Sequence, residues 1–97
     1  MFLSRFIVSG RSMEPVFREG GKLLVSNLIY KFRGPKADEV VVLKDPRDGR
    51  LILKRIKEVR GDEYFVSGDN EGESTDSRSF GWITKKDVLG KVLIRYF

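Results

Sequence analysis

Short apolar runs separated by polar turns extend along most of the chain, a pattern typical of β strands in a small protein. VVVL at residues 40–43 has no polar position, so we expect a strand that is buried on both faces. DPRDG at residues 45–49 is a strong turn signal, which predicts a hairpin between that strand and the next one. The predicted strands are residues 2–8, 22–25, 40–43, 51–56, 64–66 and 88–97.

Helical signals are few. Residues 27–32 are long enough for one turn, and TKKD at residues 84–87 matches a capping box over a short helical turn. The polar stretch SGDNEGESTDSRS at residues 67–79 predicts a long loop, and such loops in small domains are usually functional or mobile. Because no repeat or linker interrupts the sequence, residues 1–97 are predicted to form one all-β, barrel-like domain.

The composition excludes several kinds of site. The chain has no Cys and no His, which removes a disulfide framework, a thiolate nucleophile, the usual zinc ligand and the usual general base. No metal and no organic cofactor is implied. Any hydrolytic chemistry must therefore use Ser, Thr, Lys, Tyr, Asp or Glu side chains.

The net charge of +5 is unevenly distributed along the chain. Residues 31–60 hold ten basic and five acidic residues, whereas residues 61–80 hold one Arg and six acidic residues. The basic residues alternate with apolar ones, which indicates outward-facing strand positions rather than a stripe for nucleic acid. We therefore expect no nucleic-acid partner, and salt-sensitive binding to DNA or RNA would contradict this.

Apolar runs are also too short for a membrane span. None approaches the roughly 18–20 residues that cross a bilayer. MFLSRFIV at residues 1–8 is interrupted by Ser4 and Arg5 and lacks the pattern of a secretory signal. The chain is expected to be soluble, with at most a peripheral contact with a membrane.

Three short segments gain meaning from their order along the chain. VSGRSMEPVF at residues 8–17 contains Ser12, the predicted strand at residues 51–56 contains Lys54, and the polar loop contains GDN and STDSRS. Each segment alone has an ordinary structural interpretation, but in this order they resemble the signal peptidase I family of serine proteases over nearly the whole chain. The matching residues are Val8, Gly10, Ser12, Met13, Pro15, Lys54, Arg55, Gly68, Asp69, Asn70, Ser74, Asp76, Ser77, Arg78, Phe80 and Gly81.

This resemblance implies a serine endopeptidase built on coiled antiparallel sheets, the fold of the signal-peptidase catalytic core. It implies Ser12 as the nucleophile, Lys54 as the general base and Ser74 as a hydrogen-bond partner that orients the lysine. A free lysine has a pKa near 10.4, which must fall by roughly three units before it accepts a proton at neutral pH. Burial among apolar neighbours such as Leu53 and Ile56 is sufficient, because it shifts lysine pKa values by up to about 3–5 units.

Further roles follow from the same resemblance. The backbone N–H of Ser12 is the expected oxyanion donor. Gly10 occupies a position where some family members have a hydroxyl side chain, and it is expected to let the substrate backbone approach closely.

The polar loop is expected to support the catalytic residues. Asp76 and Arg78 would hold it through an ion pair that also involves Arg55. Asp69 and Asn70 belong to the same support.

The implied substrate is a precursor polypeptide. An extended peptide would add to the cleft as a further β strand, with small residues such as Ala before the cut. The residues expected to line its shallow apolar pockets are Phe6, Val8, Met13 and Leu53.

The sequence departs from the family pattern at two turns and at its start. Gly21 stands where the family usually has an aspartate, and Ala37 stands in place of a glycine. Neither position carries the chemistry. Typical members have a membrane anchor before the serine. The larger departure is that this anchor is missing here, since the chain begins only eleven residues before Ser12.

Several functions remain open at this point. STDSRSFGW at residues 74–82 resembles the small anchorless peptidases that mature nickel-type superoxide dismutase by removing an N-terminal extension in the cytoplasm. A signal peptidase proper, held at the extracytoplasmic face of a membrane by an anchor or partner, is the alternative. From other classes come a non-catalytic peptide-binding module and a self-cleaving repressor-type protease, which would need an upstream DNA-binding domain.

Overall fold

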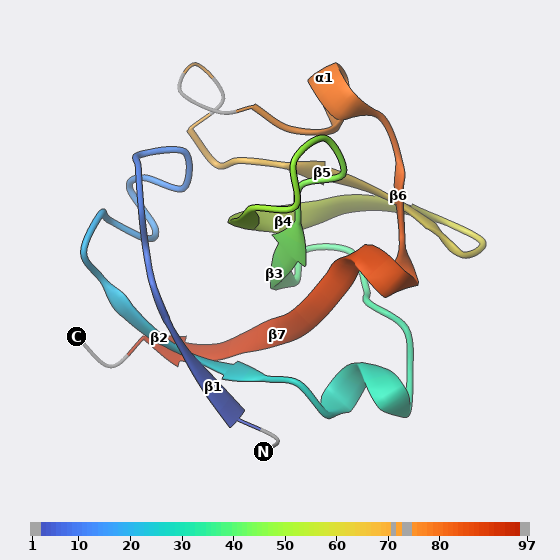
Figure 1. Ribbon diagram of the computed structural model, residues 1–97, viewed down its shortest axis with the longest axis horizontal. Coiled ribbons are helices and arrows are strands. Elements are labelled where there is room, and N and C mark those ends of the chain that lie inside the picture. Colours follow the sequence, from blue (N-terminus) through green and yellow to red (C-terminus); the bar gives the residue numbers. More distant parts are fainter. Residues whose placement is uncertain (1–2, 71, 73–74, 96–97) are drawn as a thin grey trace.

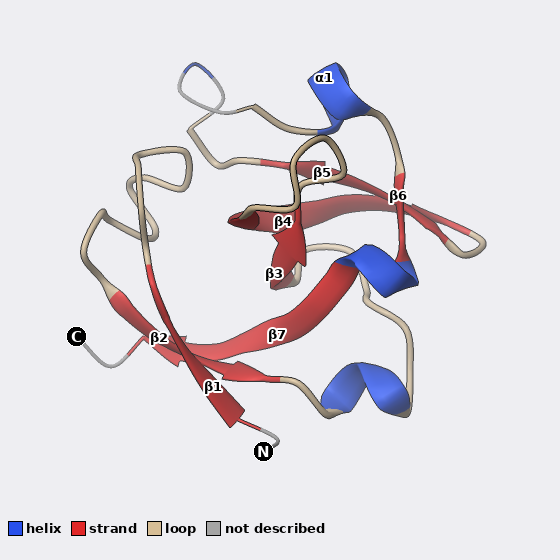
Figure 2. Ribbon diagram, in the orientation of Figure 1, coloured by secondary structure: helices blue, strands red, loops and turns tan. Residues whose placement is uncertain are grey.

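The computed structural model describes residues 3–70, 72 and 75–95, and its regular structure is almost entirely β (Figure 2). The strands are β1 Leu3–Ile7, β2 Lys22–Ser26, β3 Val40–Lys44, β4 Leu51–Arg60, β5 Glu63–Ser67, β6 Ile83–Thr84 and β7 Val88–Arg95. The short helical elements are η1 Ile29–Lys31, α1 Ser77–Phe80 and η3 Lys85–Asp87. The predicted all-β fold class is confirmed.

The strands form one curled antiparallel sheet in the order β1-β2-β7-β3-β4-β5-β6 (Figure 1). β7 lies between β2 and β3, so the strand that is last along the chain joins the first hairpin to the rest of the sheet. The curl brings the β1–β2 loop and the chain after β5 to the same side of the molecule (Figure 1).

All six predicted strands are present, with differences at their ends. The capping box at residues 84–87 is confirmed at η3, and a helical turn lies within residues 27–32. β4 continues to Arg60, beyond the predicted end at residue 56. The prediction of a loop over all of residues 67–79 is wrong at its end, because Asp76 accepts a hydrogen bond from the Arg78 N–H and so caps α1.

β3 is buried on both faces, as its sequence predicts, and it separates two clusters of the core. Val40 and Val42 pack in one cluster with residues from β1, β2 and β7. Val41 and Leu43 pack in the other cluster with residues from η1, β4, β5 and β7. Because successive side chains of a strand point to opposite faces, this one strand supplies both clusters.

The centre of the sheet requires a glycine in β7. A Cβ atom added to Gly90 would lie 2.5 Å from the backbone oxygen of Ser26 and 2.7 Å from Cγ1 of Val25. The backbones of β2 and β7 therefore approach more closely at this point than any side chain allows.

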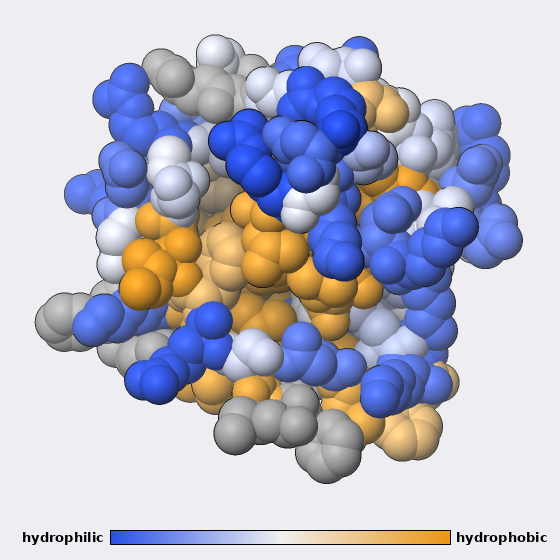
Figure 3. All heavy atoms as spheres, in the orientation of Figure 1, coloured by the Kyte–Doolittle hydropathy of each residue, from blue (hydrophilic) through white to orange (hydrophobic). Residues whose placement is uncertain are grey.

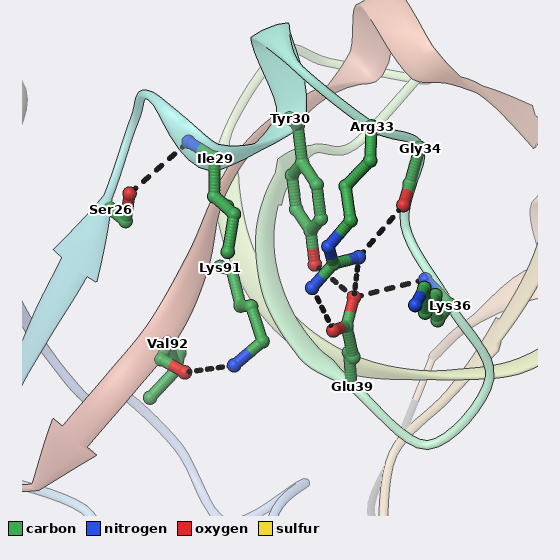
Figure 4. Close-up of polar contacts among 9 residues, drawn as sticks. All are labelled: Ser26, Ile29, Tyr30, Arg33, Gly34, Lys36, Glu39, Lys91 and Val92. Atoms are coloured by element: carbon green, nitrogen blue, oxygen red, sulfur yellow. Dashed lines mark hydrogen bonds and ion pairs between the residues drawn. The ribbon is translucent and has the colours of Figure 1, made fainter.

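A polar cluster fixes the connection between η1 and β3 (Figure 4). The Tyr30 hydroxyl donates to Glu39 Oε1 at 2.8 Å, and the Lys36 N–H donates to the same oxygen at 2.9 Å. Arg33 pairs with both carboxylate oxygens of Glu39. Burial and these contacts with Glu39 raise the pKa of Tyr30 far above its ordinary value, so its hydroxyl remains a donor.

Apolar side chains gather across the middle of the face shown in Figure 3, with hydrophilic side chains around them. No helix in the described part of the chain combines the length and the apolar character needed to cross a bilayer.

Candidate active site

Ser12 lies in the loop that connects β1 to β2, and this loop is fixed at its base and its middle. The Val8 N–H donates to the Gly21 carbonyl at 2.9 Å, and the Gly20 N–H donates to the Val8 carbonyl at 2.8 Å. Met13, only 1% exposed, inserts its side chain into the first core cluster. The half-buried Ser12 is therefore held beside an anchored residue.

Gly10 adopts a backbone conformation that favours glycine. Its φ is +82°, in the left-handed region, and an added Cβ would meet nothing within 4 Å. The backbone conformation, rather than crowding, requires the glycine here, and the space beside it is open.

Lys54 lies in β4 among apolar neighbours and is 3% exposed. Strand alternation places it on the same face as Ile52 and Ile56, and it pairs with the fully buried Val41 across the hairpin. This burial lowers the pKa of Lys54, because desolvation disfavours the charged amine.

Charged groups from two segments of the chain modify this effect. The carboxylates of Asp76 and Asp45 raise the pKa of Lys54, and the Arg78 guanidinium lowers it further. The net direction is downward because desolvation is the largest of these contributions.

Ser12 and Lys54 line the same cavity, which has a volume of about 250 Å³. A neighbouring hollow of about 210 Å³ is lined by both residues as well. The remaining residues of the first cavity are Phe6, Ser9, Arg50, Leu51, Ile52 and Leu53. A hydroxyl and a buried amine thus border one space that is open to a ligand.

The start of the polar loop is fastened directly to the Ser12 segment. The Asn70 N–H donates to the Ser12 carbonyl at 2.7 Å, and Asn70 Nδ2 donates to the Arg11 carbonyl at 3.0 Å. Asp69 forms a two-bond ion pair with Arg55 of β4, at 2.9 and 2.8 Å. The residue next to Lys54 is therefore tied to the loop that touches Ser12.

A second ion pair fixes the end of the same loop. Asp76, 1% exposed, accepts from Arg78 Nε at 2.9 Å and Nη2 at 3.1 Å, and it also accepts from the Gly68 N–H at 3.2 Å. Burial raises the pKa of Asp76, but the hydrogen bonds from Arg78 and Gly68 outweigh burial and lower it to about 2. Ser74, the third predicted catalytic residue, lies outside the described residues.

The structure places the other predicted site residues in two groups. Phe6 and Leu53 line the cavity with Ser12 and Lys54. Val8 and Met13 are 4% and 1% exposed in the core and contribute nothing to the cavity wall. The two ion pairs also differ from the expected arrangement, since Arg55 pairs with Asp69 rather than joining Asp76 and Arg78.

Sequence reasoning missed Asp45 and Arg47, which line the second hollow with Ser12 and Lys54. Strand alternation contained a signal for Asp45, because positions 41, 43 and 45 share one face and Val41 pairs with Lys54. The turn signal at residues 45–49 concealed it, since an aspartate at the start of a turn needs no further explanation.

Over the ranges the structure describes, no cluster of three or more acidic residues is arranged to hold a metal ion.

Comparison with known proteins relates the chain to signal peptidases and to a mitochondrial inner membrane protease. The sequence profile described as "Signal peptidase, peptidase S26" matches residues 1–63 and 54–97. Signal peptidase I V of Bacillus subtilis is 26% identical, over 88% of this chain and 80% of that protein. Mitochondrial inner membrane protease subunit 1 of Xenopus tropicalis is 31% identical, over 92% of this chain and 66% of that protein.

Some similar proteins carry a different description. Inactive signal peptidase IA of Staphylococcus aureus is 26% identical, over 84% of this chain and 56% of that protein. The chain spans less than two thirds of the length of this relative and of the Xenopus protein.

Proposed function

The chain belongs to the signal peptidase family, peptidase S26, and on that premise we propose that it is a serine endopeptidase with Ser12 as nucleophile and Lys54 as general base. The observation that carries the proposal is the cavity lined by both residues, one a half-buried hydroxyl and the other a desolvated amine. Without histidine in the chain, a lysine of lowered pKa is the best available base.

In the proposed reaction, the neutral Lys54 amine takes the proton of the Ser12 hydroxyl as Oγ attacks a peptide carbonyl. The resulting ammonium then gives its proton to the leaving amine as the peptide bond breaks. Water then hydrolyses the acyl-serine: Lys54 takes a proton from the water and gives it to Ser12 Oγ as the acyl–oxygen bond breaks. Ser74 is proposed to orient the lysine in each step.

The negative oxygen of the intermediate needs a donor. Among the described residues, the Ser12 N–H donates no hydrogen bond, so it is available for that oxygen. The open space beside Gly10 leaves room for the substrate backbone.

The proposed substrate is the extended segment of a precursor polypeptide. Phe6 and Leu53 provide the apolar part of the cavity wall, which suits small apolar side chains next to the cut. Because Val8 and Met13 are buried, their proposed contribution is to shape the base of this site from the core.

The dyad is tested by cleavage of precursor proteins by wild type, Ser12→Ala and Lys54→Met across pH 6 to 10. Methionine preserves most of the apolar volume of lysine, so Lys54→Met keeps the core filled while removing the base. We expect both variants to lose at least about a thousandfold in kcat/KM. The wild-type activity should rise with an apparent pKa well below 10.4.

Lys57→Met is the matched control, because Lys57 is exposed in the same strand. It should cleave like wild type. If Lys54→Met also cleaves like wild type, the assignment of the base is wrong.

The same assay separates two proposed substrates. One is the precursor of a nickel-type superoxide dismutase, which would place the enzyme in the cytoplasm. The other is a secretory preprotein, which would place it at a membrane, where peripheral contact or a partner would hold it. Cleavage of the preprotein alone would reject the dismutase proposal while leaving the dyad intact.

A peptide-binding module is the second candidate function, and the relatives named inactive favour it. The presence of both Ser12 and Lys54 favours the enzyme. Saturable binding of precursor peptides by wild type, without cleavage at any pH, would establish the binding module instead.

A further inference from the structure

The turn between β3 and β4 holds a third ion pair at the candidate site, with a buried carboxylate. Asp45 is 2% exposed, and its carboxylate accepts from Arg47 Nε at 3.0 Å and Nη2 at 2.6 Å. The Arg47 backbone N–H adds a third bond, at 2.9 Å. These contacts satisfy a carboxylate that would otherwise be buried without a partner.

This carboxylate lies on the same side of the hairpin as Lys54. Asp45 follows Val41 and Leu43 on one face of β3, and these pair with Lys54 and Ile52 of β4. Asp45, Arg47 and Lys54 also line one hollow together with Ser12. The pair is therefore part of the wall of the space in which the chemistry is proposed.

Arg47 also contacts the segment that carries the Asp76–Arg78 ion pair. Its guanidinium lies 5.4 Å from the centre of the Phe80 ring, at the end of α1. Asp76 and Arg78 are the N-cap and second residue of that helix. Arg47 thus joins the hairpin turn to the helix whose first turn carries Asp76 and Arg78, two charges that also act on Lys54.

The charges around Lys54 come from three elements. The acidic residues among them are Asp45 and Asp76, and each is paired with an arginine. The charged residues that face Lys54 or line its hollow are Asp45, Arg47, Arg50, Asp76, Arg78 and Arg11. An unpaired carboxylate among them would take the lysine as its counter-ion.

We propose that Arg47 is a positioning residue of this reaction, holding Asp45 in a closed ion pair so that Asp45 does not pair with Lys54. The inference rests on the proposed role of Lys54 as the base. Two effects on pKa support it. Asp45 raises the pKa of Lys54, and hydrogen bonds from Arg47 lower the pKa of Asp45.

The test compares the pH dependence of kcat/KM in wild type, Arg47→Gln and Asp45→Asn. In Arg47→Gln the carboxylate loses its partner and stabilises the lysine ammonium, so the acid limb should move to higher pH by about one unit. In Asp45→Asn the carboxylate is gone, so the limb should move to lower pH. Damage to the fold would lower activity without moving the two midpoints in opposite directions.

Two further variants sharpen the comparison. Arg47→Lys keeps the positive charge but not the two-bond geometry, so it should shift the midpoint in the same direction by a smaller amount, and it carries the test if Arg47→Gln does not fold. Arg60→Gln is the matched control, because Arg60 also pairs with a carboxylate, Glu58, and lies over an aromatic ring, Trp82, but on the exposed β4–β5 hairpin. Its pH midpoint should equal that of wild type.

A second readout does not require activity. In a Ser12→Ala background with ¹³C-labelled lysine, NMR titration of Lys54 Cε should show the same two opposite shifts. If wild type cleaves but neither variant moves the kinetic midpoint or the NMR midpoint, only the role of Arg47 is refuted and the proposed function stands. If wild type does not cleave, the proposed function fails, and the NMR shifts still decide whether Arg47 controls Asp45.

Discussion

Glu39 and Asp76 show how single side chains keep buried charge in this protein. For Glu39, burial raises the pKa, but the Arg33 hydrogen bonds, the Lys36 N–H and the Tyr30 hydroxyl together lower it to about 2. The pKa of Asp76 is also about 2, for similar reasons. Both groups therefore stay ionised at neutral pH and fix their segments through charged hydrogen bonds.

Acid should weaken the fold through these groups. The ordinary pKa of Glu is 4.5 and its folded value at Glu39 is about 2, so the unfolded chain binds the proton more readily. The stability from Glu39 is complete above about pH 4.5 and is lost as the pH falls towards 2. We expect Glu39→Gln to be about 2 kcal/mol less stable at pH 7 and to lose less stability across this window.

Urea unfolding from pH 2 to 7 measures this prediction. Glu19→Gln, at an exposed loop position, is the control and should follow wild type. If the free energy of unfolding changed equally with pH in Glu39→Gln and wild type, the assignment of this acid dependence to Glu39 would be wrong.

At the scale of elements, the sequence predicted the strands and turns whose pattern is set by burial in the core. The buried β3 and the turn after it were readable because VVVL and DPRDG are strong local patterns. The continuation of β4 over KEVR was not, because residues 57–60 are all exposed and residues 58–60 pair only with β5. β6 has two residues and α1 has four, which is too short for either periodicity to appear.

The candidate site also has a part that the sequence predicted and a part that it did not. Ser12 and Lys54 were predicted from short motifs, and the structure brings them to one cavity. The position of Asp45 depends on the register of two strands, and the partner of Arg55 depends on how the polar loop folds back. Such tertiary contacts leave no local pattern in the sequence.

The close approach of β2 and β7 gives a prediction at this scale. Gly90→Ala places a methyl group against the Ser26 backbone oxygen, which cannot rotate away. We expect a loss of about 2–3 kcal/mol in the free energy of unfolding, measured by urea denaturation. Gly72→Ala is the control, because its Cβ would meet nothing within 4 Å, and a similar loss there would show that the contact is not the cause.

At the scale of the whole molecule, β3 connects the two core clusters. Its alternate residues belong to different clusters, so one cluster cannot lose its packing while β3 remains in place for the other. This arrangement supports the prediction that residues 1–97 form one cooperative domain.

We therefore expect a single unfolding transition. Trp82, whose ring packs against Phe65 at 5.4 Å, reports on the β5–β6 end of the sheet by fluorescence. Far-UV circular dichroism reports on all strands. The two urea curves should coincide, and a fluorescence change that precedes the loss of strand signal would indicate separate units.

The position of β7 also has a consequence for the protein during its synthesis. The β1–β2 hairpin, which carries Ser12, pairs with the remainder of the sheet only through β7. A ribosome makes Ser12 and Lys54 before residues 88–95, so both residues precede β7 in the growing chain. Until then the hairpin with Ser12 and the hairpin with Lys54 share no strand pairing, and among the described residues only core packing and the contacts of Asp69 and Asn70 join them. Pairing of β7 with both β2 and β3 therefore completes the backbone framework around Ser12 and Lys54.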